Sequence, residues 1–442
     1  MDVELQIRKH LRRDAQPTVS LVDEYCSEYE GIFPEVRSYE CFKYLHIGII
    51  SEIKRKSLPE IAKAVGLKSP QALHHFLSKS PWKAQALKEK RLSKTLLALK
   101  GKPIRVIIDE TGDRKKGKKT DYVARQYLGS IGKVDRGIVS VNAYGVYQDI
   151  TIPLIVKVFK PKGTLKAEDQ YKTKIEIASE IISELIDFGF NIELVLADSL
   201  YGESSSFIQT LEQYNLSWIV AIRSNHGVWM APGQRVRANK WNEFERRFSD
   251  RTSEKRYIRE IVFGKRSSRT YWEVTTDPEK MPKNSTSFVM TNIQESLGKL
   301  KKSVGNLYGC RTWIEYGFRQ GKQELGWTNY RLTDFQNIEK WWEIIFSVYL
   351  MISLNSQVFV QRQPQRTESS NSEPSDCHLH QHWNHKGGWK NTLNNLRLLI
   401  QPTILFGLIS PWLDIFPSRK LWLGFNELIR VINQFPFHVP DG

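Results

Sequence analysis

Cysteine is scarce in this chain of 442 residues, and the cysteines that occur form no paired pattern. The four are Cys26, Cys41, Cys310 and Cys377, and none belongs to a CxxC motif. The sequence therefore predicts neither a disulfide framework nor a cysteine-based zinc site. A reducing, cytosolic compartment is the expected location.

Uninterrupted apolar runs are also missing. The N-terminal stretch MDVELQIRKHLRRD contains no apolar core of the signal-peptide kind. The apolar run at 341–360 is broken by polar residues such as Glu343 and Asn355, which favours a buried helix over a membrane span. We therefore expect no membrane partner.

Acidic residues are too few to balance the basic ones. Lysine and arginine number 65 and aspartate and glutamate 48, which gives a net charge of +17. Such an excess favours a polyanionic partner, usually a nucleic acid. The alternative is a generally basic protein with no such partner.

Composition and periodicity divide the chain into six expected segments. These are a helical DNA-binding region at 1–100, a first core part at 101–222, a β-rich insertion at 223–297, a second core part at 298–360, a linker or disordered loop at 361–388, and a helical extension at 389–442. The linker is polar and rich in Gln, Ser, Asn and His, a composition typical of unstructured segments.

A helix-turn-helix pattern occupies residues 57–79. Ser57 and Glu60 form an S-x-x-E capping box, and Gly66 ends the first helix. A second helix begins after Ser69. Its expected outward-facing residues are Gln71, His74, His75 and Lys79. These would contact DNA, although many helical hairpins share this pattern without binding DNA.

From residue 103 the pattern changes to strands and helices in alternation. The strand IRVIID and three further strand-like runs precede a helix at about 172–188, which is followed by the strand IELVLAD, a helix near 203–214 and the strand SWIVAI. This order predicts an α/β fold with a ribonuclease-H-like core. The basic segment 231–270, with 12 basic against 5 acidic residues (12 − 5 = +7), falls in the β-rich insertion. That insertion could equally be a solvated surface elaboration.

Two aspartates end predicted buried strands. Asp109 ends IRVIID and Asp198 ends IELVLAD. Carboxylates at the ends of neighbouring parallel strands would lie close together, and a divalent cation would relieve their repulsion. Alternatively, the two aspartates cap the turns that follow. Glu110 adjoins Asp109, but strand alternation places it on the other face, so we exclude it from the site.

A narrow stripe of polar residues follows later in the chain. In one continuous helix, Tyr308, Arg311, Glu315 and Lys322 would fall within about 60° of one another. Such a face suits a site where Glu315 holds a metal ion and the other three contact phosphates. The alternative is a solvated helix face with i,i+4 charge pairs.

The spacing Tyr308-x2-Arg311-x3-Glu315-x6-Lys322 resembles the Y-R-E-K signature of bacterial insertion-sequence transposases of the DDE class. The contexts DETGDRKKGKKTDYVARQYLGSIGK and VLADSLYGES, and the tail GWKNTLNNLRLLIQP, are similar to those of insertion-sequence family 701, a relative of family 4. The resemblance covers most of the chain and is weakest at the ends and in 361–388.

The resemblance implies a metal-dependent DNA transposase. It implies a catalytic triad of Asp109, Asp198 and Glu315, two Mg²⁺ or Mn²⁺ ions, and cut-and-paste movement of DNA. The partners would be transposon terminal inverted repeats and target DNA, with a homodimer in the synaptic complex, in the bacterial cytoplasm near the nucleoid. Trp229 is a candidate for stacking on a flipped base.

Three alternatives remain open at the level of sequence. The chain could be a DNA-binding protein that kept the fold without the activity, or a nuclease that only hydrolyses DNA. A rival metal site is CHLHQHWNH, with one cysteine and four histidines in a polar stretch. The sequence names neither the inverted repeats nor the route of second-strand cleavage.

Overall fold

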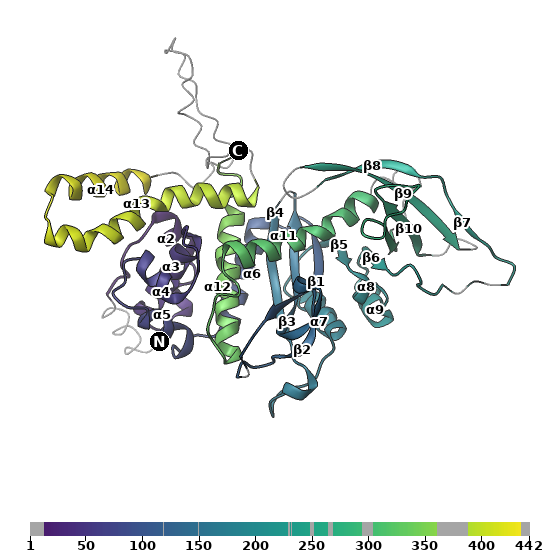
Figure 1. Cartoon of the computed structure of the whole chain (residues 1–442), viewed down its shortest axis with the longest axis horizontal. Helices are drawn as coiled ribbons and strands as arrows, with labels where there is room; N and C mark the ends of the chain where they lie inside the picture. Colours follow the sequence, from purple (N-terminus) through teal and green to yellow (C-terminus); the bar gives the residue numbers. More distant parts are fainter. Residues whose placement is uncertain are drawn as a thin grey trace, which may run out of the picture. The chain divides into compact units, whose positions relative to one another are not determined.

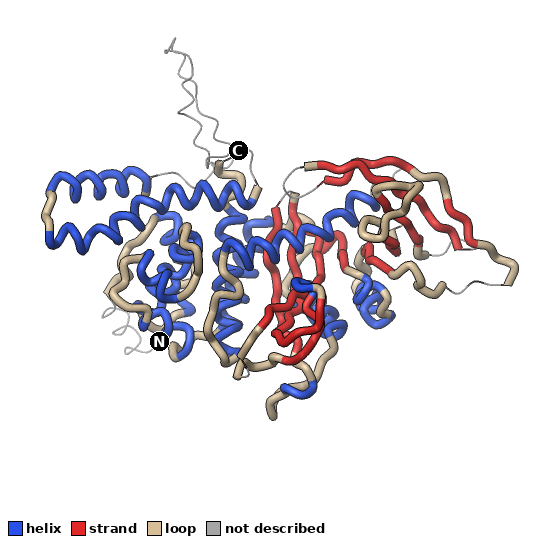
Figure 2. The backbone as a smooth tube through the Cα atoms, viewed as in Figure 1, coloured by secondary structure: helices blue, strands red, loops and turns tan. Residues whose placement is uncertain are grey.

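The computed structural model describes residues 13–117, 119–148, 150–228, 230, 232–247, 252–263, 268–293, 304–359 and 388–434. Two compact units make up the chain. One combines Met1–Thr95 with Gln320–Gly442 and is helical; the other, Leu96–Arg319, contains the sheet (Figures 1 and 2).

The helical unit is built around one buried helix. Its helices are α2 (Ser20–Ser27), α3 (Val36–Ile50), α4 (Leu58–Ala64), α5 (Gln71–Ser78), the first part of α6 (Ala84–Leu99), α12 (Phe335–Leu354), α13 (Trp389–Ile415) and α14 (Arg419–Ile432). Helix α3 packs against α2, α4, α5, α12 and α13, and it is buried on nearly every side. Its buried charged residues are paired, Glu40 with Arg13 and Lys43 with Asp23, as burial of charge requires.

Helix α12 confirms the expected buried helix at the long apolar run. Glu343 of α12 accepts hydrogen bonds from Arg91, and both side chains are almost completely buried. A buried ion pair of this kind satisfies both charges where either one alone would be costly. A second apolar helix, α13, is long and apolar enough to cross a membrane by length and composition alone.

The α/β unit is organised on one mixed sheet. The main path runs β2-β3-β1-β5-β6-β11-β10-β9-β7, with β4 paired to β3 and β8 paired to β9. The strands are β1 (Ile104–Arg114), β2 (Ala124–Leu128), β3 (Lys133–Tyr147), β4 (Ile150–Phe159), β5 (Ile192–Ala197), β6 (Trp218–Ile222), β7 (Val236–Ala238), β8 (Asn242–Arg247), β9 (Ser253–Phe263), β10 (Thr270–Thr275) and β11 (Ser287–Thr291).

The first five core strands follow the order expected from the sequence. Strands β1 and β3 are antiparallel, whereas β5 lies parallel to both β1 and β6. This mixed α/β arrangement is consistent with a ribonuclease-H-like fold. The segment after β6 forms strands, as expected, and β11 pairs with β6, so these strands continue the core sheet.

The helices that accompany this sheet among the described residues include α7 (Lys174–Asp187), α8 (Ser199–Gly202), α9 (Ser205–Gln213) and α11 (Trp313–Arg319). Helix α7 begins with a capping box between Thr173 and Glu176 and packs on β3 and β4. Helix α11 packs on β1, β3 and β4. At Gly317 of α11, a side-chain carbon would come within 2.7 Å of the Tyr144 ring, so glycine permits the close approach.

Candidate active site

Asp109 and Asp198 occupy neighbouring positions at the end of the parallel ladder. The last paired residues of β1 and β5 are Ile108 and Ala197, and each aspartate comes next in its own chain segment. The sequence predicts that this strand ends at Asp109, and that prediction is wrong. Strand β1 continues to Arg114, because its antiparallel pairing with β3 extends past the parallel ladder. Asp109 therefore lies within the sheet, and Asp198 lies directly after it.

The alternative role, in which the two aspartates cap the turns that follow them, applies to Asp198 only. Asp198 is the N-cap of α8, and its Oδ1 accepts a hydrogen bond from the Leu200 amide at 2.9 Å. Asp109 lies within a strand and caps no helix; its Oδ1 accepts from the adjacent Glu110 amide at 2.8 Å. Capping therefore does not explain why Asp109 is present.

The two carboxylates lie in an environment that disfavours their charge. Burial raises the pKa of Asp109 to about 7, an effect that Arg311 opposes and the Asp198 charge reinforces. Burial also raises the pKa of Asp198, again against the influence of Arg311. Acidic groups held close together in a low-dielectric site fit a cation, which would stabilise both ionised forms.

The face of the sheet to which Asp109 points is the face covered by α11. Asp109 pairs directly with Asn142 of β3, so these two side chains point to the same face of the sheet. Tyr144 lies two residues further along β3, so its side chain points to that face as well. Tyr144 contacts Gly317 and Phe318 of α11. The strand and the helix therefore direct Asp109 toward the segment that carries Arg311 and Glu315.

Arg311 links two of the three predicted catalytic carboxylates. Its Nη1 lies 3.5 Å from Asp109 Oδ2, and its Nη2 lies 3.4 Å from Glu315 Oε1. The Glu315 side chain is 57% exposed, whereas Asp109 is 13% exposed. Within the described ranges, no three acidic, cysteine or histidine side chains are close enough to hold a metal ion. The positively charged guanidinium of Arg311 lies between the carboxylates of Asp109 and Glu315.

Glu110 points to the other face, as strand alternation requires. Its carboxylate accepts a hydrogen bond from Lys174 at 2.7 Å and one from the Tyr201 hydroxyl at 3.3 Å. Lys174 opens α7, the helix that packs on β3 and β4. The contacts of Glu110 therefore differ from those of Asp109, although the residues are adjacent.

The segment with the Y-R-E-K spacing is not one regular α-helix. Residues 304–309 are helical, a 3₁₀ turn follows at Cys310–Thr312, then α11, and then a π-helical turn at Gln320–Glu324. These turns change the number of residues per turn, so the narrow stripe calculated for an ideal helix does not apply over its whole length. Lys322 belongs to the helical unit, and its role stays a prediction.

A basic pocket of about 510 Å³ lies beside Arg311, and the sequence had not assigned most of its residues. It is lined by Tyr308, Arg311, Thr312, Glu315, Tyr316 and Arg319 from the helical segment, and by Arg246, Arg256, Asn284, Ser285 and Ser287 from the strands after β6. Arg246 donates to Thr312 Oγ1 at 3.0 Å. The excess of basic over acidic residues in 231–270 indicated a positively charged segment, but not that Arg246 and Arg256 would line a pocket.

The predicted helix-turn-helix forms within the helical unit. Helices α4 and α5 flank a turn in which Gly66 has φ of +72°, a conformation that favours glycine. Ser57 is the N-cap of α4 but makes no side-chain capping bond, so the predicted capping box is wrong. The four residues expected to face outward, Gln71, His74, His75 and Lys79, are all exposed.

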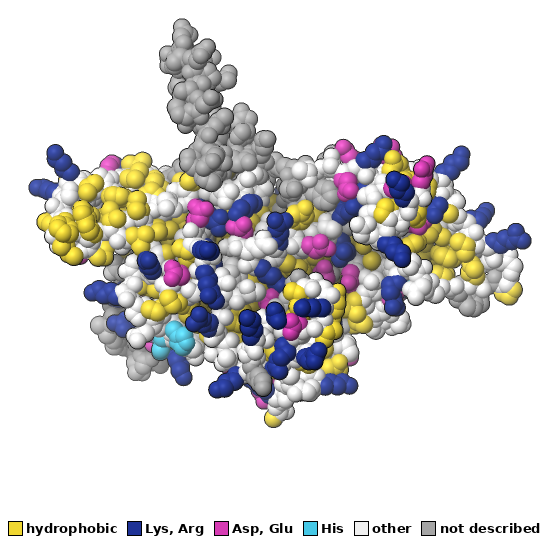
Figure 3. Space-filling model, in the orientation of Figure 1, with side chains coloured by type: hydrophobic (Ala, Val, Ile, Leu, Met, Phe, Trp, Pro, Cys, Tyr) yellow, Lys and Arg dark blue, Asp and Glu magenta, His cyan; other side chains and the backbone are white. Residues whose placement is uncertain are grey.

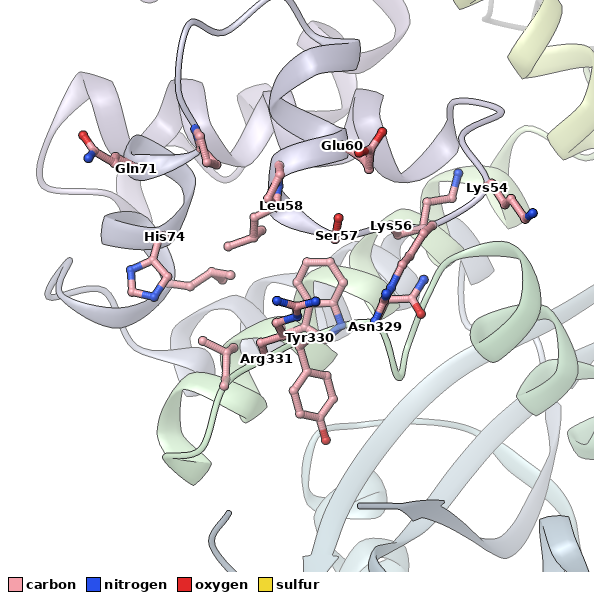
Figure 4. A pocket seen from close by; sticks show the side chains of 16 residues that line it. Lys54, Lys56, Ser57, Leu58, Glu60, Gln71, His74, Asn329, Tyr330 and Arg331 are labelled. Atoms are coloured by element: carbon pink, nitrogen blue, oxygen red, sulfur yellow. The ribbon is translucent and has the colours of Figure 1, made fainter. Parts of the chain in front are cut away.

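A large pocket lies beside this helix pair. It measures about 1240 Å³ and is lined by Gln71 and His74, the segment 54–60, and Asn329–Leu332 (Figure 4). Lys54, Arg55 and Arg331 place positive charge around it, whereas burial lowers the pKa of Lys56 to about 7. Trp229 and the His-rich tract at 377–385 lie outside the described residues, so the predictions made for them stay predictions.

Comparison with known proteins places the chain in a family. Residues 32–251 match the family described as DDE superfamily endonuclease, and residues 165–351 match the transposase DDE domain. A probable transposase for insertion sequence element IS701 from Microchaete diplosiphon is 55% identical over 328 residues, which cover 74% of this chain and 86% of that protein. Together with Asp109 on β1 and Asp198 directly after β5, these matches show that the chain belongs to the IS701 family of DDE transposases.

Proposed function

We propose that this DNA transposase cuts transposon ends and joins them to target DNA through a site formed by Asp109, Asp198 and Glu315. The observation that carries the proposal is that Asp109 and Asp198 directly follow the last residue pair of the β1–β5 ladder, with pKa values raised by burial. Glu315 would complete the set once Arg311 no longer bridges it to Asp109.

These carboxylates suit divalent cations, and we propose two Mg²⁺ or Mn²⁺ ions held by Asp109, Asp198 and Glu315. When bound, such ions activate the attacking oxygen and stabilise the leaving oxygen of an in-line displacement at phosphorus. Arg311, Tyr308 and Lys322 would orient the phosphates next to the scissile bond through charge-assisted and hydroxyl contacts. Arg246 of β8, Arg256 of β9 and Arg319 of α11 would extend this positive surface.

The DNA itself would be held mostly outside the carboxylate site. We propose that α5 contacts the terminal inverted repeats through Gln71, His74, His75 and Lys79, which are exposed on a short helix after a tight turn. Trp229 would stack on an extruded base. Two copies of the chain would bring both ends together in the bacterial cytoplasm, where the nucleoid supplies the target.

The test uses Asp109→Asn and a labelled transposon end with Mg²⁺ or Mn²⁺. We expect end binding to persist while cleavage falls at least about 1000-fold, because the variant loses a carboxylate and keeps the DNA-binding surface. Asp187→Asn, the same change at an exposed position of α7, is the matched control and should cleave normally.

The products distinguish the proposal from its alternatives. Cleaved ends joined to target DNA support transposition. Cleavage without joined products would leave a hydrolytic nuclease. End binding without cleavage in either metal, or normal cleavage by Asp109→Asn, would contradict the assignment of the site.

A further inference from the structure

Positive charge is concentrated in the segment that joins β1, β2 and β3. Residues 114–136, called the basic hairpin below, contain eight basic and two acidic side chains (8 − 2 = +6), about a third of the net charge of +17. Both acidic side chains are paired, Asp121 with Lys166 and Asp135 with Arg114. Lys and Arg side chains gather in Figure 3 over the part of the molecule where Figure 1 places β2 and β3.

The basic hairpin also exposes large apolar side chains. Tyr127 is 57% exposed, Val134 is 54% exposed, and Ile131 in the turn between the strands is 40% exposed. Tyr127 pairs directly with Val134 across the two strands, so both side chains lie on one face. Arg125, two residues before Tyr127, is exposed on that face as well. The outward face therefore combines apolar and basic side chains.

The opposite face of the basic hairpin packs on β1. Leu128 is completely buried, and a side-chain carbon at Gly112 of β1 would come within 2.6 Å of it. Gln126, on the same face as Leu128, donates a hydrogen bond from Nε2 to the Gly137 carbonyl at 2.8 Å. The outward face is therefore held in place before a partner binds, which lowers the entropic cost of association.

The turns of the basic hairpin are open to a partner. A side-chain carbon at Gly117, Gly129 or Gly132 would meet no atom of the described chain within 4 Å. Glycine also lets another backbone approach closely at these positions. Wherever the structure describes side chains in 114–136, those that are exposed are basic or apolar, and the other exposed residues are glycines.

Duplex DNA matches both parts of this surface. Lysine and arginine bind phosphates whatever the base sequence, and proteins that bend DNA insert apolar side chains between base pairs from the minor groove. A merely solvated hairpin would not expose three large apolar side chains within eight residues, because such clusters mark interaction surfaces. Asn and Gln, the side chains that read adenine, are missing from the exposed residues described in 114–136, so the surface suits DNA of any sequence.

We infer that the basic hairpin binds target DNA, with Lys116, Arg125 and Lys133 on the phosphates and Tyr127 and Ile131 in the minor groove. The inference rests on the proposed strand transfer, in which DNA of unrelated sequence is the acceptor. Insertion of the apolar side chains would bend the target and open the stacking of its base pairs.

Strand β1 connects this surface to the carboxylate site. It carries Asp109 and ends at Arg114, where the basic hairpin begins. Five residues of a strand span about 17 Å, which is about half a helical turn of duplex DNA. A target bound at the basic hairpin would therefore have phosphates within reach of the carboxylate site.

The first test measures binding of the full chain to a duplex of unrelated sequence by fluorescence anisotropy, which requires no cleavage. Arg125→Ala with Lys133→Ala should weaken binding about 10-fold. It should also reduce the slope of log affinity against log salt by about 1.8 in magnitude, since each lost phosphate contact contributes about 0.9. Lys100→Ala with Lys102→Ala is the matched control, because it removes two exposed charges just before β1, at the other end of that strand, and should keep the wild-type slope.

The second test measures the joining of a pre-cleaved transposon end to target DNA. Tyr127→Ala with Ile131→Ala should lower joining about 10-fold on a fully paired target and much less on a target with a mismatch, because mismatched bases cost less to unstack. Tyr214→Ala with Val236→Ala changes two exposed apolar side chains elsewhere in the α/β unit and should join both targets normally.

Thermal melts verify folding, and the single changes Arg125→Ala and Ile131→Ala replace a double variant that unfolds. An unchanged salt slope in the charge variant, or equal losses on paired and mismatched targets in the apolar variant, would overturn the inference. Lost self-association with unchanged duplex binding would assign the surface to a second copy and overturn it as well. A wild-type chain that joins no DNA would contradict the proposed function instead, and the binding test would still decide whether the basic hairpin holds DNA.

Discussion

Arg311 combines two roles at the scale of single residues. Its guanidinium lies 3.5 Å from the Asp109 carboxylate and 3.4 Å from the Glu315 carboxylate. It also lines the basic pocket with Tyr308 and Arg319. In the proposed mechanism, Arg311 would release the exposed Glu315 before the three carboxylates could share ions.

Replacement of Arg311 or Lys322 by alanine should reduce cleavage far more than DNA binding. Each change removes one charge-assisted contact to a reacting phosphate, worth about 1.5–3 kcal/mol, and small misplacements cost about 100-fold in rate. We expect end affinity to fall by no more than a few-fold, because the distant contacts remain. Cleavage rate, gel-shift affinity and a melting curve are measured on the same samples.

Arg237→Ala is the control for these variants, since Arg237 is an exposed arginine of β7 outside the basic pocket. Equal losses of rate and affinity in Arg311→Ala would make Arg311 part of a general docking surface. A large drop in melting temperature would instead give it a structural role.

At the scale of elements, the packing of α3 against α12 contains a buried titratable group. His46 of α3 is completely buried, with Nδ1 2.8 Å from the Phe42 carbonyl and Nε2 2.9 Å from Ser347 Oγ of α12. Burial lowers the pKa of His46 to about 4, although the contact with the Phe42 carbonyl opposes this shift. The folded unit therefore holds this imidazole neutral.

The helical unit should consequently lose stability in acid. Between pH 6.5 and pH 4 the unfolded chain binds a proton at His46 that the folded chain does not, so the free energy of unfolding falls as the pH falls. From pH 7.5 to pH 4.5 we expect the wild-type chain to lose roughly 2–3 kcal/mol more than His46→Gln. Urea unfolding at both pH values provides the measurement.

His74→Gln is the matched control, because His74 is exposed on α5 and has no buried contact to lose. It should show the same loss of stability in acid as the wild-type chain. An identical acid response in His46→Gln and the wild-type chain would mean that other groups cause the destabilisation.

At the scale of the whole molecule, the net charge of +17 predicts strongly salt-dependent DNA binding. Each phosphate neutralised by a Lys or Arg side chain contributes about −0.9 to the slope of log affinity against log salt. We expect a slope of at least about −5 for a transposon end, because both the basic pocket and the α5 surface carry positive charge. Fluorescence anisotropy from low to moderate salt measures the slope.

A double-stranded DNA of unrelated sequence separates specific from general binding. It should show a similar slope with lower affinity, since the phosphate contacts are shared and the base contacts are not. A nearly flat salt response for both DNAs would show that the positive charge serves some purpose other than DNA binding.

The local sequence was sufficient for those features that depend on neighbouring residues. Helix α7, the outward face of α5 and the burial of α12 all follow from apolar spacing, because that spacing determines which side of an element leaves water. Strand alternation likewise predicted that Asp109 and Glu110 point to opposite faces. The Y-R-E-K spacing and the two aspartate contexts indicated the family.

Tertiary structure alone decided the features that depend on distant partners. Strand β1 continues past Asp109 because β3 pairs with it, and the strands after β6 join the core sheet through β11. The bridge that Arg311 makes to Asp109 joins positions about two hundred residues apart, and the exposure of apolar side chains on α13 and α14 is known only from the folded structure. Periodicity states that a face is apolar; only the fold determines what covers it.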